Sequence, residues 1–261
     1  DYLRILRFFR FYGGYGRPPI NREALDACRR RADKLSELSG ERVRDEMIKI
    51  LSVPDPAEIL LQMRGVGALD VILPEAGDVA RLRMVNWLET RAVNIEGVEV
   101  DPIRHLAALL DPDQLEQAAL SVAERWRLSN TERSRLTDLA APTVEITAEM
   151  DPADEMRALR HLGTGQVRDL ALLSWAQELT DSSRLPRPRT DSYIALLELC
   201  ARWIAPEFPL SGADVLALGL IEGPEVGVIL ESVEDWWENG GYKADRQQCL
   251  DRLVRETGAD K

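Results

Sequence analysis

The chain has 261 residues, a formal net charge of −12, 45% hydrophobic and 30% charged residues. This composition supplies a sizeable core for about two domains, and it excludes a membrane-spanning segment because no run of eighteen apolar residues occurs. Cys28, Cys200 and Cys249 are too few and too widely spaced for a disulfide scaffold or a zinc site, so we expect reduced thiols, no metal site in this chain and a cytoplasmic protein.

The negative charge argues against a whole chain wrapped in nucleic acid, but its distribution is uneven. Residues 1–50 hold twelve Lys/Arg against eight Asp/Glu, whereas the other 211 residues hold 21 against 37. Any surface that binds nucleic acid is therefore local, and the best phosphate candidates lie in the first fifty residues. The predicted RNA-backbone contacts there are Arg10, Arg29, Arg30, Arg31 and Lys34, and the alternative is an ordinary solvated helix face.

Residues 1–10 form an amphipathic pattern in which Asp1, Arg4, Arg7 and Arg10 repeat every three positions, as on one face of a helix. Asp1 accepts hydrogen bonds and Arg4 donates them, so the two side chains can together read a base edge that has an amine beside an acceptor. Cytosine and adenine present such an edge, while uracil and guanine do not. The alternative is a common surface ion pair between the two residues.

A second helix is predicted at 22–38 and a third at 38–51, where Ser39 is placed to cap the helix and Glu41 lies in its first turn. Further helices are predicted at 57–73, 101–110, 115–126 and 129–140. Asp-Pro pairs at 55, 101, 111 and 151 indicate helix starts, and Ser129 with Glu132 forms a capping-box pattern. His105 and His161 lie among leucines and arginines, which favours structural roles over catalysis.

Two later segments interrupt the helical pattern. Residues 182–192 contain two prolines, which predicts a connection without regular helix. At 211–227, Ser211 is expected to cap a helix, and Gly219, Gly223, Pro224 and Gly227 are expected to form a tight turn. Backbone N–H groups at Gly223 and Gly227 could hold an RNA phosphate, although Glu222 and Glu225 oppose it and a plain helix-helix turn is the alternative.

Several of these segments together resemble one known family. Asp1-Tyr2-Leu3-Arg4 is similar to the end of a Glu-Asp-x-x-Arg motif, and Ser39, Glu41, Arg42 and Glu46 match a following Ser-x-Glu-Arg motif, with Arg44 at a variable place. Residues 73–77 and 210–237 fit later blocks of the same family. The chain thus resembles the C-terminal part of bacterial class II CCA-adding tRNA nucleotidyltransferases and poly(A) polymerases.

The resemblance and the helical pattern predict an all-α, elongated array with a neck at 1–66, a body at 67–160 and a tail at 161–261. By the resemblance, Asp1 and Arg4 recognise the base of incoming CTP or ATP, and Arg7, Ser39, Glu41 and Arg42 support them. The family's Mg²⁺-binding catalytic head is not found in these residues. Glu99-Val100-Asp101 has the spacing of a metal pair, but Asp101-Pro102 favours a helix start.

We therefore expect the nucleotide-selecting and RNA-binding region of a template-independent polymerase that adds CCA to tRNA 3′ ends. Its expected partners are tRNA, ATP, CTP and its own N-terminal catalytic head, with no membrane, and these residues alone are expected to be inactive. Poly(A) addition by the same family stays open, because both enzymes share the neck. So does a non-enzymatic all-α scaffold with an acidic surface that binds other proteins.

Overall fold

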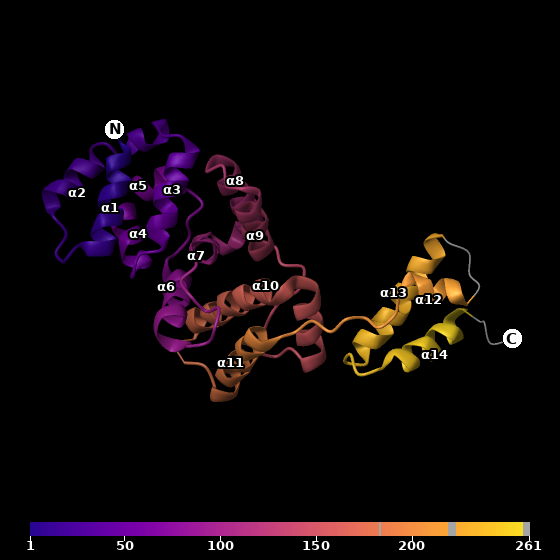
Figure 1. Ribbon diagram of the computed structural model, residues 1–261. Helices are drawn as coiled ribbons and strands as arrows, with labels where there is room; N and C mark the ends of the chain where they lie inside the picture. The colour runs from indigo at the N-terminus through magenta and orange to yellow at the C-terminus, as the bar shows by residue number, and fades with distance from the viewer. Residues whose placement is uncertain (183, 219–222, 258–261) are drawn as a thin grey trace. The chain divides into compact units, whose positions relative to one another are not determined.

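A computed structural model describes residues 1–182, 184–218 and 223–257 of the chain (Figure 1). The all-α prediction is confirmed, because every element in these ranges is a helix and their only strand-like feature is one isolated bridge, between Ala76 and Leu110. In chain order the helices are α1 (Leu3–Tyr15), α2 (Arg22–Arg29), η1 (Ala32–Glu37), α3 (Gly40–Leu51), α4 (Pro56–Gly65), α5 (Ala68–Ile72), α6 (Ala80–Trp87), η2 (Leu88–Ala92), α7 (Pro102–Leu109), η3 (Pro112–Gln114), α8 (Leu115–Arg125), α9 (Asn130–Ala140), α10 (Pro152–Asp181), α11 (Arg187–Arg202), α12 (Gly212–Ala217), α13 (Pro224–Asn239) and α14 (Arg246–Thr257).

The predicted helix starts are confirmed wherever aspartate precedes proline. Each of the four aspartates accepts backbone N–H groups of the following turn, with distances between 2.9 and 3.1 Å: Asp55, Asp101, Asp111 and Asp151. The proline that follows costs no helical hydrogen bond, because an N–H in the first turn has no carbonyl acceptor within the helix. Ser129 and Glu132 form the predicted capping box at the start of α9.

Three predicted helix boundaries were wrong. The helix expected at 57–73 is divided into α4 and α5, because Gly67 adopts a left-handed conformation at φ 74°. The helix expected at 22–38 ends at Arg29 and is followed by the separate 3₁₀ turn η1. The proline-rich connection at 182–192 was expected to be irregular, yet α11 begins at Arg187 because Pro188 lies in the first turn, where a proline is tolerated.

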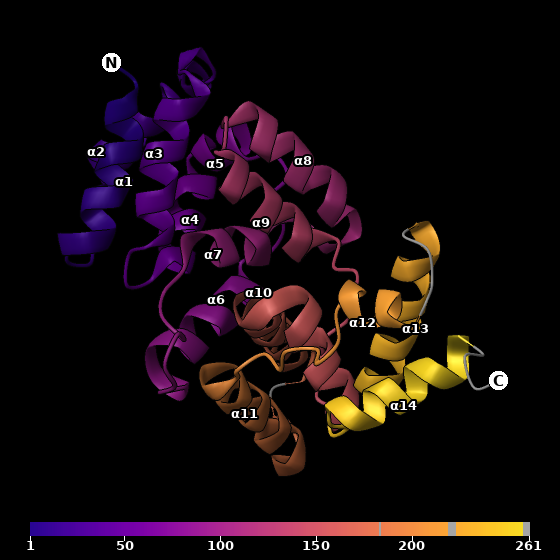
Figure 2. The ribbon, with the colours of Figure 1, turned by 45° about the vertical axis from the view of Figure 1, so that its right-hand side comes forward.

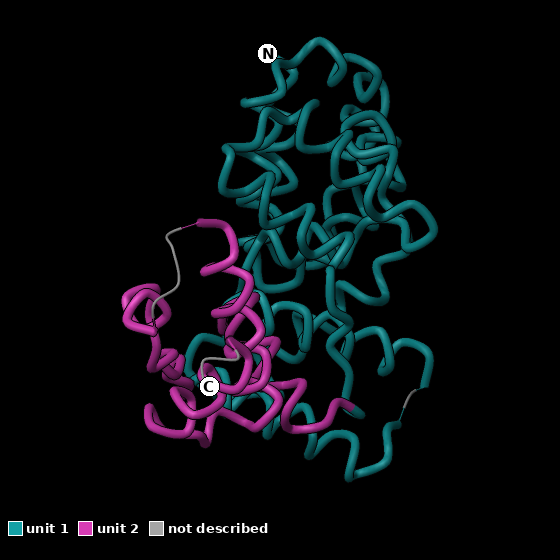
Figure 3. The backbone as a smooth tube through the Cα atoms, turned by 90° about the vertical axis from the view of Figure 1, so that its right-hand side faces the viewer, with its two compact units in different colours: residues 1–149, 165–201 teal, residues 150–164, 202–261 magenta. Residues whose placement is uncertain are grey.

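The described contacts divide the chain into two compact units (Figure 3). Unit 1 contains residues 1–149 and 165–201, and unit 2 contains residues 150–164 and 202–261. Helix α10 contributes to both units, and Gly163 interrupts it with a non-helical φ of 80° and ψ of 158°. The division into neck, body and tail stays a prediction.

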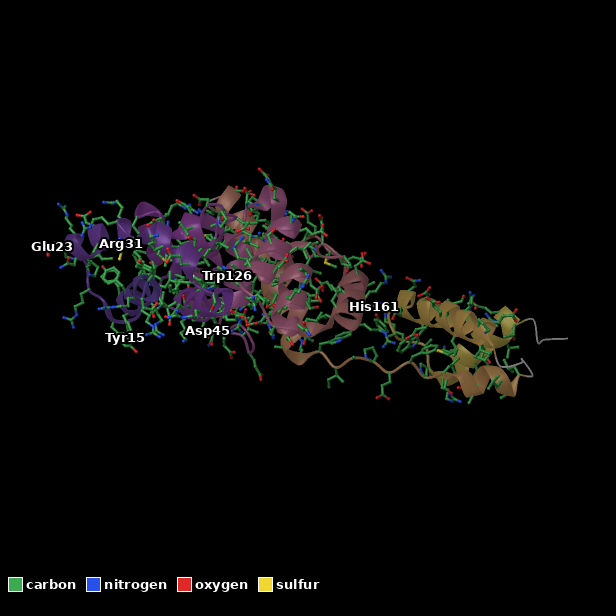
Figure 4. All side chains as sticks on the ribbon, turned by 90° about the horizontal axis from the view of Figure 1, so that it is seen from above. Tyr15, Glu23, Arg31, Asp45, Trp126 and His161 are labelled. Carbon is green, nitrogen blue, oxygen red and sulfur yellow. The ribbon has the colours of Figure 1, made fainter. Side chains whose placement is uncertain are left out.

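Unit 1 begins with α1 packed against α3 and α4 (Figure 1). Phe9, Met47 and Leu60 are fully buried in this contact region, and each such side chain contributes roughly 1.5–3 kcal/mol of hydrophobic stabilisation. Helices α8 and α9 lie side by side as a hairpin (Figure 2). Trp126, labelled in Figure 4, ends this first hairpin helix and donates its indole N–H to the Ile72 carbonyl at 3.0 Å. The packing of α1 against α3 sets the distances between the side chains that these two helices bring to the candidate site.

Unit 2 has a core of its own, formed by residues of α12, α13 and α14. Val215, Val233 and Cys249 are fully buried there, and Trp237 is 3% exposed. Arg160 and His161, from the part of α10 that belongs to this unit, both contact Glu238 on α13, at 2.7 and 2.9 Å. His161 therefore has the structural setting that its sequence context predicted.

Candidate functional site

Asp1 is held in place by two contacts at the start of α1. One carboxylate oxygen, Oδ1, accepts the backbone N–H of Leu3 at 3.1 Å, and the other, Oδ2, accepts from Nη2 of Arg42 on α3 at 2.5 Å. About half of each of the two charged side chains remains exposed to solvent. Arg42 of the Ser-x-Glu-Arg motif thus lies against Asp1 in the structure, and the supporting role expected of Arg42 stays a prediction.

Arg4 lies in the first turn of α1, three positions after Asp1, and is exposed. Its side chain makes no hydrogen bond or ion pair with any residue in the described part of the chain, so Asp1 and Arg4 do not form the common i, i+3 pair. A guanidinium presents five N–H donors in a fixed plane. These donors are free for a ligand beside an oriented carboxylate, which is the arrangement that base recognition requires.

Arg7 and Arg10 both contact Glu46, which lies on α3 with 4% of its side chain exposed. Arg7 Nε donates to Oε1 at 3.2 Å, whereas Arg10 Nε lies 3.2 Å from Oε2 without hydrogen-bond alignment. Arg10 also covers the Phe11 ring, with Cζ 4.5 Å from its centroid. These contacts give both arginines a role in joining α1 to α3. The predicted contact of Arg10 with RNA stays a prediction.

The capping role expected of Ser39 was wrong in its detail. Ser39 occupies the N-cap position of α3, but its side chain accepts no backbone N–H of the first turn. The pKa of the Glu41 carboxyl is lowered below its ordinary value, chiefly by a hydrogen bond from the backbone N–H of Glu41 itself. The Ser39 hydroxyl and the Arg127 guanidinium lower it further. Glu41 pairs with Arg127 at 3.0 Å on the surface, which favours a supporting role.

Of the four basic residues around α2 and η1, two are committed to local partners. Arg29 pairs with Asp26 at 2.8 Å, and Lys34 pairs with Glu37 at 2.8 Å. Arg30 and Arg31, the second of which is labelled in Figure 4, are exposed. Their side chains have no hydrogen bond or ion pair within the described ranges. Arg30 and Arg31 are therefore the basic residues best placed to bind phosphate.

The glycine turn near residue 223 differs from the prediction. Gly223 precedes α13 in an extended conformation, with φ 176°, and Gly227 lies inside the first turn of α13 and not in the connection. Gly219 and Glu222 lie outside the described residues. Contact of Gly223 and Gly227 with a phosphate stays a prediction.

A buried polar network that sequence reasoning missed lies where α7, η2 and α10 meet. Arg104, 2% exposed, donates to Glu89 at 2.7 Å and to Asp169 at 2.6 Å, and Arg135 donates to Asp101 and Asp169. His105 faces oxygen acceptors with both ring nitrogens, Glu89 at 2.6 Å and the Leu51 carbonyl at 2.7 Å. No local pattern in the sequence indicates this network, because its partners are far apart along the chain.

Asp101 belongs to this network and serves as the helix cap that the sequence predicts. Burial opposes its ionisation, but the N–H of Arg104 and the guanidinium of Arg135 outweigh burial and lower the pKa of the Asp101 carboxyl. The part of the chain that the structure describes gathers no three His, Cys, Asp or Glu side chains that could hold a metal ion. None of its described helices is long and apolar enough to cross a membrane.

The amino-acid sequence of this chain is similar to those of known proteins. Residues 19–78 match the family described as the probable RNA and SrmB-binding site of polymerase A. The mitochondrial CCA tRNA nucleotidyltransferase 1 of Danio rerio is 29% identical over 260 residues, which are 97% of this chain and 55% of that protein. The human protein of the same name is 26% identical over 98% of this chain and 55% of its own length. This chain thus spans about half the length of these relatives.

Solved structures share the fold. A CCA-adding enzyme in complex with ATP aligns over 98% of this chain and 60% of its own chain, with a TM-score of 0.64 and 17% identity. A Thermotoga maritima CCA-adding enzyme complexed with tRNA aligns over 98% of this chain and 61% of its own, with a TM-score of 0.55 and 16% identity. At these identities the likeness establishes the helical arrangement of this chain.

Proposed function

We propose that this chain is the C-terminal region of a CCA-adding enzyme, and that it selects the incoming nucleotide and binds RNA for CCA addition to tRNA 3′ ends. Supporting this proposal are the family relationship along nearly the whole chain and the match of residues 19–78 to an RNA-binding region. The substrates we propose for the whole protein are CTP, ATP and tRNA.

The observation that carries the proposal is the free guanidinium of Arg4 beside the fixed carboxylate of Asp1. Cytosine and adenine each offer an exocyclic amine next to a ring nitrogen acceptor. Asp1 would accept from the amine, and Arg4 would donate to the ring nitrogen. Uracil and guanine reverse both groups, so each would leave a donor facing a donor and an acceptor facing an acceptor. Such mismatches cost more than a lost contact does.

RNA binding is proposed for the surface that carries Arg30 and Arg31. Both arginines lie within the segment that matches the RNA-binding family, and both are unpaired in the described structure. Backbone phosphates bind such free cations without reading sequence. The local excess of positive charge in residues 1–50 suits this task, while the remainder of the chain is acidic.

Phosphoryl transfer needs magnesium to activate the RNA 3′-hydroxyl and to neutralise the leaving pyrophosphate. We assign the metal ligands to an N-terminal catalytic head that works with this chain, so that the 261 residues alone have no activity. Arg7, Ser39, Glu41 and Arg42 would hold the recognition helix in position. A cytoplasmic location is part of the same proposal; the curated relatives compared above carry mitochondrial in their names.

Poly(A) addition is the second candidate, because the matched family is named for polymerase A. A poly(A) polymerase must favour ATP over CTP, whereas Asp1 and Arg4 suit both bases equally. Incorporation of CTP onto a tRNA that lacks its 3′ end therefore separates the two activities.

The test of the proposal is Arg4→Ala in the protein that carries both this region and the head, with all four nucleotides supplied at constant magnesium. Loss of one discriminating partner costs about 1–3 kcal/mol, so the preference for CTP and ATP should fall roughly 5- to 150-fold. Arg31→Ala is the matched control, since it should weaken RNA binding and slow all four nucleotides equally. An equal slowing by Arg4→Ala would make Arg4 a phosphate contact and contradict base reading.

A further inference from the structure

A hollow of about 640 Å³ lies within unit 1, lined by residues of α7, α9, the loop before α7 and the part of α10 that follows Gly163. Figure 2 labels these three helices. This volume falls in the range of pockets that bind small molecules, roughly 300–1,000 Å³. Its wall contains Arg168, Gly97, Ser134 and Asp138. None of these residues belongs to the recognition helix α1, so the hollow is formed by different elements from the site of Asp1 and Arg4.

Arg168 is the unusual member of this wall. It is partly buried, its Nε atom is buried without a hydrogen-bond partner, and its side chain forms no ion pair with any residue of the described ranges. Its guanidinium lies directly against Gly97, where a Cβ would overlap Nη1, and Gly97 has a left-handed φ of 84°. Arg168 is thus a charged donor that packs closely against Gly97 but has no hydrogen-bond acceptor among the described residues.

The other charges of the inner wall are already matched. Arg104 is bonded to Glu89 and Asp169, and Arg135 is bonded to Asp101 and Asp169, so both guanidinium groups already have carboxylate partners. An unpaired buried donor is costly, and it is usually satisfied by a partner that supplies the missing acceptor. For a guanidinium, a phosphate supplies that acceptor with matching geometry.

The rim of the hollow has the opposite character. Asp138 and Glu99 are exposed acceptors there, and Asp138 accepts from the Ser134 hydroxyl at 3.3 Å. Carboxylates repel a bare phosphate, but they accept hydrogen bonds from hydroxyl groups. A ligand that carries hydroxyls next to a phosphate satisfies both parts, and a ribonucleotide unit has this combination.

We propose that this hollow is a second ribonucleotide site, in which Arg168 donates to the phosphate and the carboxylates of Asp138 and Glu99 accept from ribose hydroxyls. The phosphate could belong to the RNA backbone or to a free ribonucleotide. Only the expectation that RNA is a physiological source rests on the proposed function. The contact with the 2′-hydroxyl would distinguish ribose from deoxyribose.

The Nε–H signal of Arg168 in a ¹⁵N NMR spectrum of the 261-residue chain reports on this site, and its loss in Arg168→Lys assigns it. We titrate the chain with AMP, with 2′-deoxy-AMP and with a tRNA that lacks its 3′ CCA. The signal should move on binding, and AMP should bind several-fold tighter than 2′-deoxy-AMP. Movement with tRNA alone identifies the RNA backbone as the source, and movement with AMP identifies a free nucleotide.

Arg168→Ala should weaken binding of the active probe roughly tenfold or more, since it removes a charge-assisted contact. Its melting temperature should stay unchanged, because the side chain has no partner to lose among the described residues. Arg133→Ala is the matched control: it removes an exposed arginine of α9 that does not line the hollow. Gly97→Ala should also weaken binding, by displacing the guanidinium.

If the Arg168 signal stays fixed with every probe, or if Arg168→Ala and Arg133→Ala weaken binding equally, the ribonucleotide site does not exist. The outcome for the proposed function is separate. Arg30→Ala combined with Arg31→Ala should weaken tRNA binding through the first fifty residues, and it should leave any AMP-dependent movement of the Arg168 signal intact.

Discussion

Arg42 reaches Asp1 across 41 positions of sequence, with its Nη2 atom 2.5 Å from Oδ2 of the carboxylate. The other oxygen of Asp1 accepts the N–H of Leu3, so the orientation of the carboxylate is set before any ligand arrives. Arg4, its neighbour on the helix, is left without such a contact in the described structure. One partner of the proposed base-reading pair is thus positioned, and the other is available.

Replacing Arg42 by Ala should therefore change selectivity more than stability. Both side chains are about half exposed, so loss of the pair should lower the free energy of unfolding by less than about 1 kcal/mol. The freed Asp1 carboxylate should discriminate less well among the four nucleotides in an incorporation assay. Arg127→Ala, which breaks the exposed contact with Glu41, should leave nucleotide ratios as they are. Equal ratios in Arg42→Ala would remove Arg42 from the recognition site.

Gly40, at the variable place of the Ser-x-Glu-Arg motif, should tolerate no side chain. A Cβ there would overlap the backbone carbonyl oxygen of Arg125, which cannot turn aside as a side chain would. Gly40→Ala should lower the free energy of unfolding by about 1–3 kcal/mol, as overpacked cores do. Gly14→Ala in α1 is the control, because nothing lies within 4 Å and the helix should gain up to about 1 kcal/mol. Urea denaturation of both variants measures the difference, and similar values would contradict the close approach.

Asp169→Asn should be strongly destabilising. Asp169 is 3% exposed and accepts from both Arg104 and Arg135. Without its charge, Arg104 stays buried beside a neutral amide, and breaking a buried pair in this way costs about 3–5 kcal/mol. Thermal unfolding measures the loss. Glu41→Gln, which alters an exposed pair, should leave the melting temperature nearly unchanged. A small effect of Asp169→Asn would mean that the network exchanges readily with water.

Tyr193 should make stability fall at high pH. Burial, with the Glu178 carboxylate that accepts its hydroxyl hydrogen at 2.9 Å, raises the pKa of Tyr193 to about 12. In the unfolded chain a tyrosine ionises near pH ~10. Between these values the unfolded state loses a proton that the folded state retains. The free energy of unfolding should therefore fall by about 2–3 kcal/mol as the pH rises from ~10 to ~12. Unfolding of Tyr193→Phe between pH 8 and 12 should lack this part of the decline.

Helix starts at Asp-Pro pairs and at the capping box could be predicted from the sequence, because these starts depend on local hydrogen bonds. Asp55 and Ser129 cap the helices that follow them, as their neighbours in sequence require. Interruptions were harder to predict. Gly67 ends the run at 57–73 through its left-handed backbone, which an isolated glycine allows but does not demand.

The candidate site was only partly predictable for a related reason. Spacing placed Asp1 and Arg4 on one helix face, but it could not show which of them would be paired. That depends on α3 packing against α1, which brings Arg42 to Asp1 and Glu46 to Arg7. The hollow beside Arg168 involves residues up to 72 positions apart, between Gly97 and Asp169, and no local pattern in the sequence indicates it.

The break at Gly163 has a practical consequence for dissecting the protein. Unit 2 is discontinuous, since Arg160 from residues 150–164 bonds to Glu238, 78 positions later. A deletion that starts at residue 202 would leave Arg160 and His161 on the truncated chain without Glu238, and an isolated fragment from 202 onward would leave that carboxylate without either cation. During synthesis, residues 150–164 must likewise wait until Glu238 has been made before Arg160 has this partner. Unit 2 can therefore complete its fold only after every residue of unit 1 has been synthesised.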